Sequence, residues 1–197
     1  MLHTPDTRPS LLLKIRDADN QAAWDEFSEI YRPVICRLAR LRGLQDSDAD
    51  DLAQQVLLAV SRAVGRWEVN PERARFRTWL KRVADNAILN ALTRGPADRA
   101  TGDDQLQWML DSRPARSDPN SDLLRTEYRR EIFRRAADHI RSEFTDDTWN
   151  AFWRTTVDGL DVDAVAHELE RTRGSIYASR SRVMKRLKQQ IQSYECE

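Results

Sequence analysis

The chain has 197 residues, and its 32 basic side chains (Lys and Arg) balance its 32 acidic ones, so the formal net charge at pH 7 is zero. Charged residues make up 32% of the chain, whereas glycine (6) and proline (7) are few, which favours a helical protein. The 2 cysteines and 3 histidines lack the spacing of a zinc site or a disulfide framework, so we predict no metal and no cofactor.

Helical periodicity along most of the chain predicts an all-α fold. A chain of this length is comfortable for two small domains. No apolar run approaches the ~20 residues that span a membrane, and the N-terminus lacks the apolar segment of a secretion signal. We therefore expect a cytoplasmic protein without membrane insertion. The predicted organisation is two small helical bundles, 10–95 and 122–193, joined by a flexible linker, 96–121.

The first bundle begins with a short helix from Ser10 and a longer one that carries an aromatic and aliphatic face. Pro33 lies inside the longer helix, where it removes one backbone donor, and Gly43 closes it. The next predicted helix is SDADDLAQQVLLAVSRAV, in which Ser47 or Asp48 can serve as the N-cap. Its inward stripe of Leu, Val and Ala leaves a polar edge that contains Asp51, Gln54 and Gln55. On chemistry alone, that edge is equally compatible with solvent and with a protein partner.

The segment RFRTWLKRVADNAILNALTR follows the turn-rich loop 67–76 and predicts another helix. Between Pro71 and Arg94, six basic residues stand against Glu72 and Asp85, which leaves four positive charges. Cations interleaved with aromatic rings and amides can hold phosphates and contact bases. Trp79 itself is more often a core residue. The candidate nucleic-acid contacts in this segment are Arg75, Arg77, Lys81, Arg82, Asn86 and Asn90.

The stretch from Gly95 to Asp122 is rich in Asp, Pro, Ser and Gly, and only LQWML within it has a helical pattern. Its six acids outnumber its three bases. A segment of this length without regular structure is typical of a linker.

The second bundle predicts a helix over 122–141, another after the N-cap Thr145, and then two helices joined by a short turn within 161–188. Asp161 and Thr172 are suitable N-caps for this last pair. Ile176, Val183 and Leu187 mark one buried stripe, and the other faces are basic. Such a pair is what a helix-turn-helix needs to enter the major groove, although a solvated basic hairpin has the same pattern. The candidate contacts are Arg171, Thr172, Arg173, Ser175, Tyr177, Ala178, Ser179, Arg182, Lys185 and Arg186.

One residue of the turn runs against this interpretation. Glu170 occupies the position where many such motifs place glycine. The difference costs little unless the residue adopts a left-handed backbone conformation.

Taken together, these segments resemble the extracytoplasmic-function (ECF) group of bacterial sigma factors over about residues 10–190. DADDLAQQVLLAV is similar to the family's polymerase-docking segment. RFRTWLKRVADNAILNALTR looks like its F-R-x-W-L-x-R-[IV]-A-x-N segment, which is quite specific. The tail from Leu160 to Leu187 is similar to its reader of the minus-thirty-five element.

The resemblance implies a non-enzymatic subunit that directs core RNA polymerase to promoters. Asp51, Gln54, Gln55 and Leu58 would dock on the clamp helices of the largest subunit, and the flap is a further implied contact on core polymerase. The helix after loop 67–76 would melt the minus-ten element, with Asn86 at the flipped base. An anti-sigma factor is a further implied partner.

Departures from the family pattern affect both ends of this prediction. Gln55 replaces an acid and Leu58 a Phe in the docking segment, while Tyr177, Ala178 and Ser179 replace the frequent R/K-S-R run. The alternative is a stand-alone helix-turn-helix regulator that never binds polymerase. An enzyme is disfavoured, because the sequence has no metal-ligand cluster, phosphate-binding glycine loop or nucleophile-base arrangement.

Overall fold

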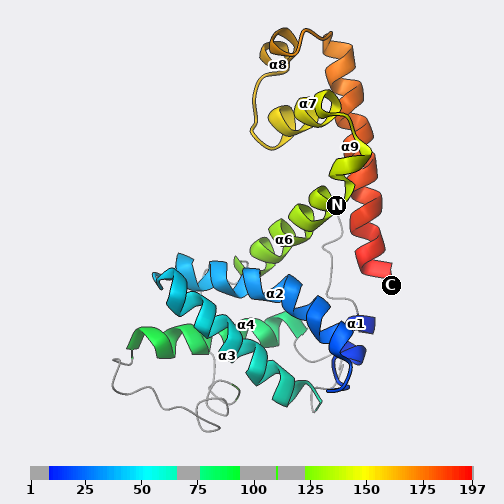
Figure 1. Ribbon diagram of the computed structural model, residues 1–197. Coiled ribbons are helices and arrows are strands. Elements are labelled where there is room, and N and C mark those ends of the chain that lie inside the picture. The colour runs from blue at the N-terminus through cyan, green and yellow to red at the C-terminus, as the bar shows by residue number, and fades with distance from the viewer. Residues whose placement is uncertain (1–8, 66–75, 94–109, 111–122, 197) are drawn as a thin grey trace. The chain divides into compact units, whose positions relative to one another are not determined.

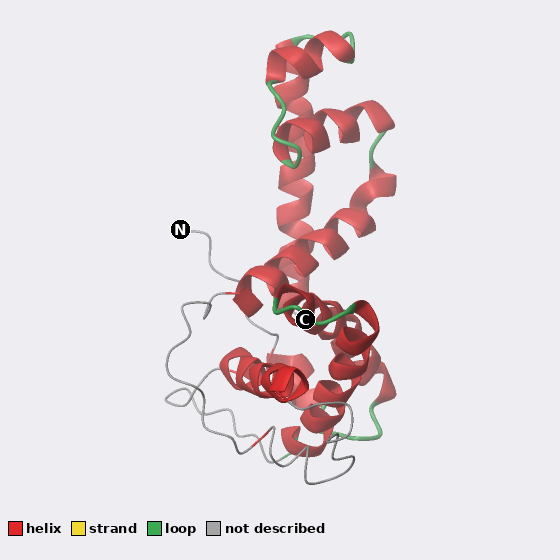
Figure 2. Cartoon of the chain, turned by 90° about the vertical axis from the view of Figure 1, so that its left-hand side faces the viewer, coloured by secondary structure: helices red, strands yellow, loops and turns green. Residues whose placement is uncertain are grey.

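The computed structural model describes residues 9–65, 76–93, 110 and 123–196, and the regular structure in this part of the chain is helical throughout (Figure 1). Colouring by secondary structure shows only helices and connecting loops among these residues (Figure 2). The prediction of an all-α protein is therefore confirmed.

Contacts between Cα atoms divide the chain into two compact units: unit 1, Met1–Glu131, and unit 2, Ile132–Glu197. The division falls inside a helix, so that the first half of that helix belongs to unit 1. The predicted linker 96–121 lies outside the described residues apart from Leu110, and its role as a linker stays a prediction.

Unit 1 is built from helices that pack in chain order, α2 on α3 and α3 on α4. These helices are α1 (Pro9–Lys14), α2 (Gln21–Leu41), α3 (Asp46–Val64) and α4 (Phe76–Thr93). The amide of Ala23 donates to the side chain of Asn20 at 3.2 Å, which caps α2. As predicted, Pro33 lies inside α2 and Gly43, with φ of +98°, follows its end.

The start of α3 differs from the prediction. The helix begins at Asp46, so that Gln45 takes the N-cap position without a capping side-chain hydrogen bond. Ser47 and Asp48 lie in the first turn instead, and the prediction that one of them caps the helix is wrong. Asp46 and Asp48 nevertheless place negative charge where the amide dipoles favour it.

The core of unit 1 combines aliphatic side chains from three helices with an aromatic group. Phe27 and Tyr31 of α2 meet Phe76 at the start of α4, with ring centroids 5.8 and 6.1 Å away. All three rings are buried, and burying a side chain of this size contributes about 1.5–3 kcal/mol. The N-terminus of α4 is thereby fixed against α2.

Unit 2 contains the second half of α6 (Leu123–Ile140), the 3₁₀ turn η2 (Arg141–Glu143), α7 (Asp146–Thr156), α8 (Val162–Glu168) and α9 (Arg173–Cys196). All three predicted N-caps are confirmed. Thr145 accepts from the Thr148 amide at 3.4 Å, and Asp161 accepts from the Asp163 amide at 2.8 Å. Thr172 accepts from the Ser175 amide at 3.2 Å, so α9 starts where the sequence places it.

Two apolar clusters hold α9 in place. Near its N-terminus, Ile176 packs with Ala151, Val165 and Ala166. Further along, Val183 and Leu187 pack with residues of α6 and α7, namely Ala136, Ala137, Ile140, Trp149 and Phe152. The predicted stripe Ile176–Val183–Leu187 is thus on the buried side of α9.

The turn between α8 and α9 contains a strained residue. Glu170 has φ of +51°, the left-handed conformation that glycine adopts without cost. The energetic cost of a left-handed backbone at a non-glycine residue is therefore incurred at Glu170. The reason is that the chain must reverse between Leu169 and Thr172 to bring α9 across α8.

Candidate nucleic-acid-binding surfaces

The exposed side of α9 is the first candidate surface. Opposite the buried stripe, Ala178, Arg182 and Lys185 are exposed, and Tyr177 retains 49% of its accessible surface. Because the helix repeats every 3.6 residues, Ala178, Arg182 and Lys185 lie on one side of it. This side combines two cations with a small residue that permits close approach, which suits a groove lined with phosphates.

Three of the predicted contact arginines are instead held by acids of neighbouring elements. Arg171 pairs with Asp147 of α7, and Arg173 Nε lies 2.9 Å from Asp163 of α8. Arg186 donates from Nε and Nη2 to the two oxygens of Glu143 in η2, at 2.7 and 2.6 Å.

The hydrogen bonds that Arg186 donates to Glu143 raise its pKa above the ordinary value of an arginine. It also donates from Nη1 to Gln190 at 3.1 Å. The guanidinium group therefore faces Glu143 and Gln190 within unit 2, and Arg186 links η2 to α9.

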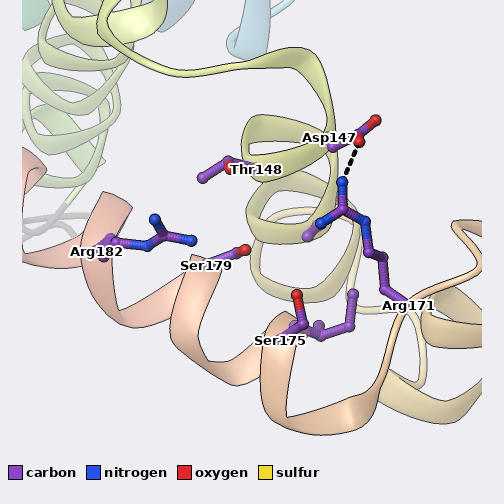
Figure 3. Close-up of a pocket in the computed structure, with 8 residues that line it drawn as sticks. Asp147, Thr148, Arg171, Ser175, Ser179 and Arg182 are labelled. Atoms are coloured by element: carbon purple, nitrogen blue, oxygen red, sulfur yellow. Dashed lines mark hydrogen bonds and ion pairs between the residues drawn. The ribbon is translucent and has the colours of Figure 1, made fainter.

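A small polar recess lies between the start of α7 and the first turns of α9 (Figure 3). Thr148 of α7 faces Ser175, Ser179 and Arg182, which follow one another along α9. Ser179 is buried here against α7, so its hydroxyl is not on the exposed side where the sequence pattern placed it. Arg182 lies at the end of the recess and remains exposed.

The predicted contacts on α4 occupy a different environment. Arg77, Lys81 and Arg82 are half-buried, and Lys81 pairs with Asp85 one turn later. Arg75 lies outside the described residues. Arg77 places its guanidinium carbon 4.9 Å from the centroid of the Tyr128 ring, within cation–π distance.

Asn86 and Asn90 are buried, with 6% and 5% of their surface exposed. Their amides therefore face the helix packing in this conformation. A role in capturing a base stays a prediction, and it requires this part of α4 to open.

The four predicted docking residues come together on α3. Asp51, Gln54, Gln55 and Leu58 are all exposed, and their spacing of three and four residues places them on one face of the helix. Leu58 keeps 47% of its surface accessible, although it is a large apolar side chain. An aliphatic side chain among amides and a carboxylate is typical of a surface that a protein partner covers.

One group of interacting residues was missed in the sequence. Glu127 and Glu131 of α6 are fully buried, and both carboxylates bind Arg37 of α2. In the sequence they stand among arginines at helical spacing, which is equally typical of solvated ion pairs. Their burial depends on a distant partner, which no local pattern shows.

The described residues contain no group of three or more His, Cys, Asp or Glu side chains suited to a metal ion. None of the described helices has the length and apolarity required to cross a membrane.

Comparisons with known proteins cover mainly the first part of the chain. Residues 27–96, which include α3, α4 and most of α2, match the family model described as Sigma-70 region 2. The chain is 33% identical over 86 residues to the ECF RNA polymerase sigma factor SigM of Mycobacterium tuberculosis, covering 44% of this chain and 42% of that protein. It is 28% identical over 109 residues to the ECF RNA polymerase sigma factor RpoE of Cereibacter sphaeroides, covering 55% and 58%. The chain thus spans about half the length of these relatives.

Proposed function

We propose that this chain, which carries a sigma-70 region 2 domain and whose distant relatives are ECF sigma factors, is a promoter-specificity subunit of RNA polymerase. This family is not enzymatic, so the chain would act by binding alone. The observation that carries the proposal is that α3, inside the region 2 match, exposes all four docking residues while α9 separately exposes a basic side.

The docking step is assigned to α3. Its exposed face offers Leu58 for apolar contact, with Asp51, Gln54 and Gln55 able to hydrogen-bond around it. The proposed partner is the pair of clamp helices in the largest polymerase subunit. Gln55 stands where the family's docking segment has an acid, which leaves Asp51 as the main charge of this face. The proposed contact with polymerase therefore relies on Leu58 and the amides.

Duplex recognition is assigned to α8 and α9 as a helix-turn-helix. The caps at Asp161 and Thr172 support this, because they define two helices joined by a short turn. The buried stripe of α9 leaves Tyr177, Ala178 and Arg182 exposed for a major groove. Arg182 and Lys185 are the best-placed cations, and Tyr177 and Ala178 would contact base edges. The proposed target is the minus-thirty-five element.

Opening of the minus-ten element is assigned to α4. Arg77, Lys81 and Arg82 would hold phosphates, which supplies affinity without sequence information. Asn86 and Asn90 would contact a flipped base only after α4 loses part of its packing. Flipping a base costs a few kcal/mol. The loosening of α4 would therefore have to occur together with base flipping.

Transcription with purified core polymerase tests the proposal. Core enzyme with and without the chain is given a genomic library, and new transcript starts are mapped. Leu58→Asp should weaken copurification with polymerase roughly tenfold or more, because it replaces apolar contact by a charge. Leu13→Asp is the matched control, since Leu13 on α1 is also an exposed leucine.

Chain-dependent starts that disappear with Leu58→Asp and persist with Leu13→Asp would support the proposal. No chain-dependent start in any condition would refute it. Tight binding to an operator duplex without copurifying polymerase would instead favour a stand-alone regulator. An anti-sigma partner stays a prediction, which mass spectrometry of the copurified proteins would address.

A further inference from the structure

Residues 127–131 of α6, which we call the 127–131 segment, lie within unit 1 and contact α2 and α4. Arg37 of α2 binds Glu131 at 2.7 Å and Glu127 at 3.1 Å. Glu127 also accepts from Arg130 at 2.5 Å. Both glutamates have 0% of their surface exposed, whereas the Arg37 side chain keeps 32%.

Two carboxylates buried on one guanidinium are an unusual way to hold a helix in place. Removing charges from water is costly, so such pairs contribute little net stability compared with apolar packing. They do fix geometry, because a slip of the helix would leave a buried charge unpaired. The 127–131 segment is therefore held in a defined position by ion pairs to Arg37.

The ring of Tyr128, which follows Glu127 in the sequence, makes the second contact of this segment with the rest of unit 1. Tyr128 stacks on Tyr31 with centroids 5.6 Å apart and planes 26° from parallel. Arg77 of α4 also lies over this ring, with its guanidinium carbon 4.9 Å from the centroid. The Tyr128 ring thus lies against both a tyrosine of α2 and an arginine of α4, and it covers Tyr31, which is fully buried.

This arrangement has the chemistry of a bound single-stranded nucleic acid. Unpaired bases stack on aromatic rings and on arginine, and their phosphates bind further arginines. In the 127–131 segment, the Tyr128 ring takes the place of the base, and the carboxylates of Glu127 and Glu131 take the place of phosphate oxygens at Arg37.

We propose that Tyr31, Arg37 and Arg77 form a binding surface for single-stranded DNA, and that the 127–131 segment occupies it as an internal substitute until DNA replaces it. Arg77 is among the phosphate contacts of the proposed function, on which this inference rests. Tyr31 and Arg37 are new assignments. Because Arg77 belongs to α4, promoter strands separated next to α4 would reach this surface.

Occupancy by the chain itself lowers the apparent affinity for DNA by the fraction of time that the surface is open. If one chain in about ten is open, removal of the segment should tighten binding about tenfold. The probe is a fluorescein-labelled dT12 oligonucleotide, titrated with the full chain and followed by anisotropy. Hydrogen exchange of residues 123–131 reports in parallel whether the segment has opened.

Two variants release the segment by different routes. Glu127→Gln with Glu131→Gln removes both charges at Arg37, and Tyr128→Ala removes the ring without touching that cluster. Asp138→Asn with Asp158→Asn is the matched control, because it deletes two carboxylates from exposed positions. The releasing variants should bind dT12 about tenfold more tightly, with faster exchange over 123–131, and the control should not.

Arg37→Ala, added to the glutamine pair, should reverse the gain. The inference is overturned if the control gains as much, if the gain is equal on duplex DNA, or if exchange rises without tighter binding. Should the glutamine pair fail to fold, Tyr128→Ala decides alone. If no variant gains affinity while the wild-type chain still initiates transcription, only this inference fails; if initiation is absent too, the proposed function fails with it.

Discussion

Arg182 and Arg186 lie four residues apart on α9, but their surroundings predict opposite responses to substitution. Arg186 is committed to Glu143 and Gln190. Arg182 is exposed and has no ion-pair partner among the described residues. We therefore expect Arg182→Ala to weaken duplex binding and Arg186→Ala to act mainly through the packing of η2 on α9.

The magnitude follows from counterion release. Seven basic residues lie between 171 and 188, three of them paired with acids and four without such a partner among the described residues: Arg180, Arg182, Lys185 and Lys188. At about −0.9 per neutralised phosphate, four cations contribute a slope of about −3.6 to the salt dependence and seven contribute about −6.3. Arg182→Ala should reduce the slope by about 1, whereas Arg186→Ala should leave the slope unchanged. If Arg182 also reads a base edge, its loss should cost ~1–3 kcal/mol and relax the sequence preference.

The assay is anisotropy of a labelled duplex, taken from a promoter mapped by transcription, over a series of potassium chloride concentrations. Gln189→Ala, an exposed neutral position of α9, controls for effects unrelated to charge. The reasoning is refuted if Arg186→Ala lowers the slope as much as Arg182→Ala does, because the pair with Glu143 would then give way to phosphate.

Three further predictions concern stability and reactivity. Glu170→Gly should relieve the left-handed backbone and stabilise unit 2 by about 1 kcal/mol, raising its melting temperature by about 4–8 °C; an unchanged or lower value would contradict this. Phe152→Ala should cost ~3–5 kcal/mol, seen as faster hydrogen exchange in α7 and α9, and exchange confined to α7 would be the contrary result. Burial, reinforced by the hydrogen bond to Asp50, raises the pKa of Cys36 from 9.0 to about 11. The folded thiol should therefore resist alkylation at neutral pH, and its contribution to stability should be lost as pH rises from about 9 to 11. Rapid labelling of the folded chain would refute the burial.

Local patterns predicted the helices of this chain well, because caps and apolar stripes act within a few residues. Thr145, Asp161 and Thr172 cap where their chemistry suggests, and Ile176, Val183 and Leu187 are buried as their spacing indicates. The exception is α3, where Ser47 and Asp48 both have the side chain of an N-cap, yet the helix begins at Asp46. Gln45 takes the N-cap position without a capping side-chain hydrogen bond.

The candidate surfaces were less predictable, since exposure and pairing depend on residues far away in the sequence. Arg186 looks like a phosphate contact until Glu143, 43 residues earlier, is placed beside it. Asn86 and Asn90 look like polar contacts, but neighbouring helices bury them. Glu127 and Glu131 show the reverse case, because acids that look solvated prove to be internal.

The length of α9 carries a consequence for how such a protein can diversify. At 24 residues it measures about 36 Å, and its buried stripe and its exposed side run in parallel along the same rod. Residues at 178, 182 and 185 can therefore be exchanged without touching the stripe that anchors the rod. A new DNA preference would require only different side chains on the exposed side of α9, while the buried stripe keeps the helix in place.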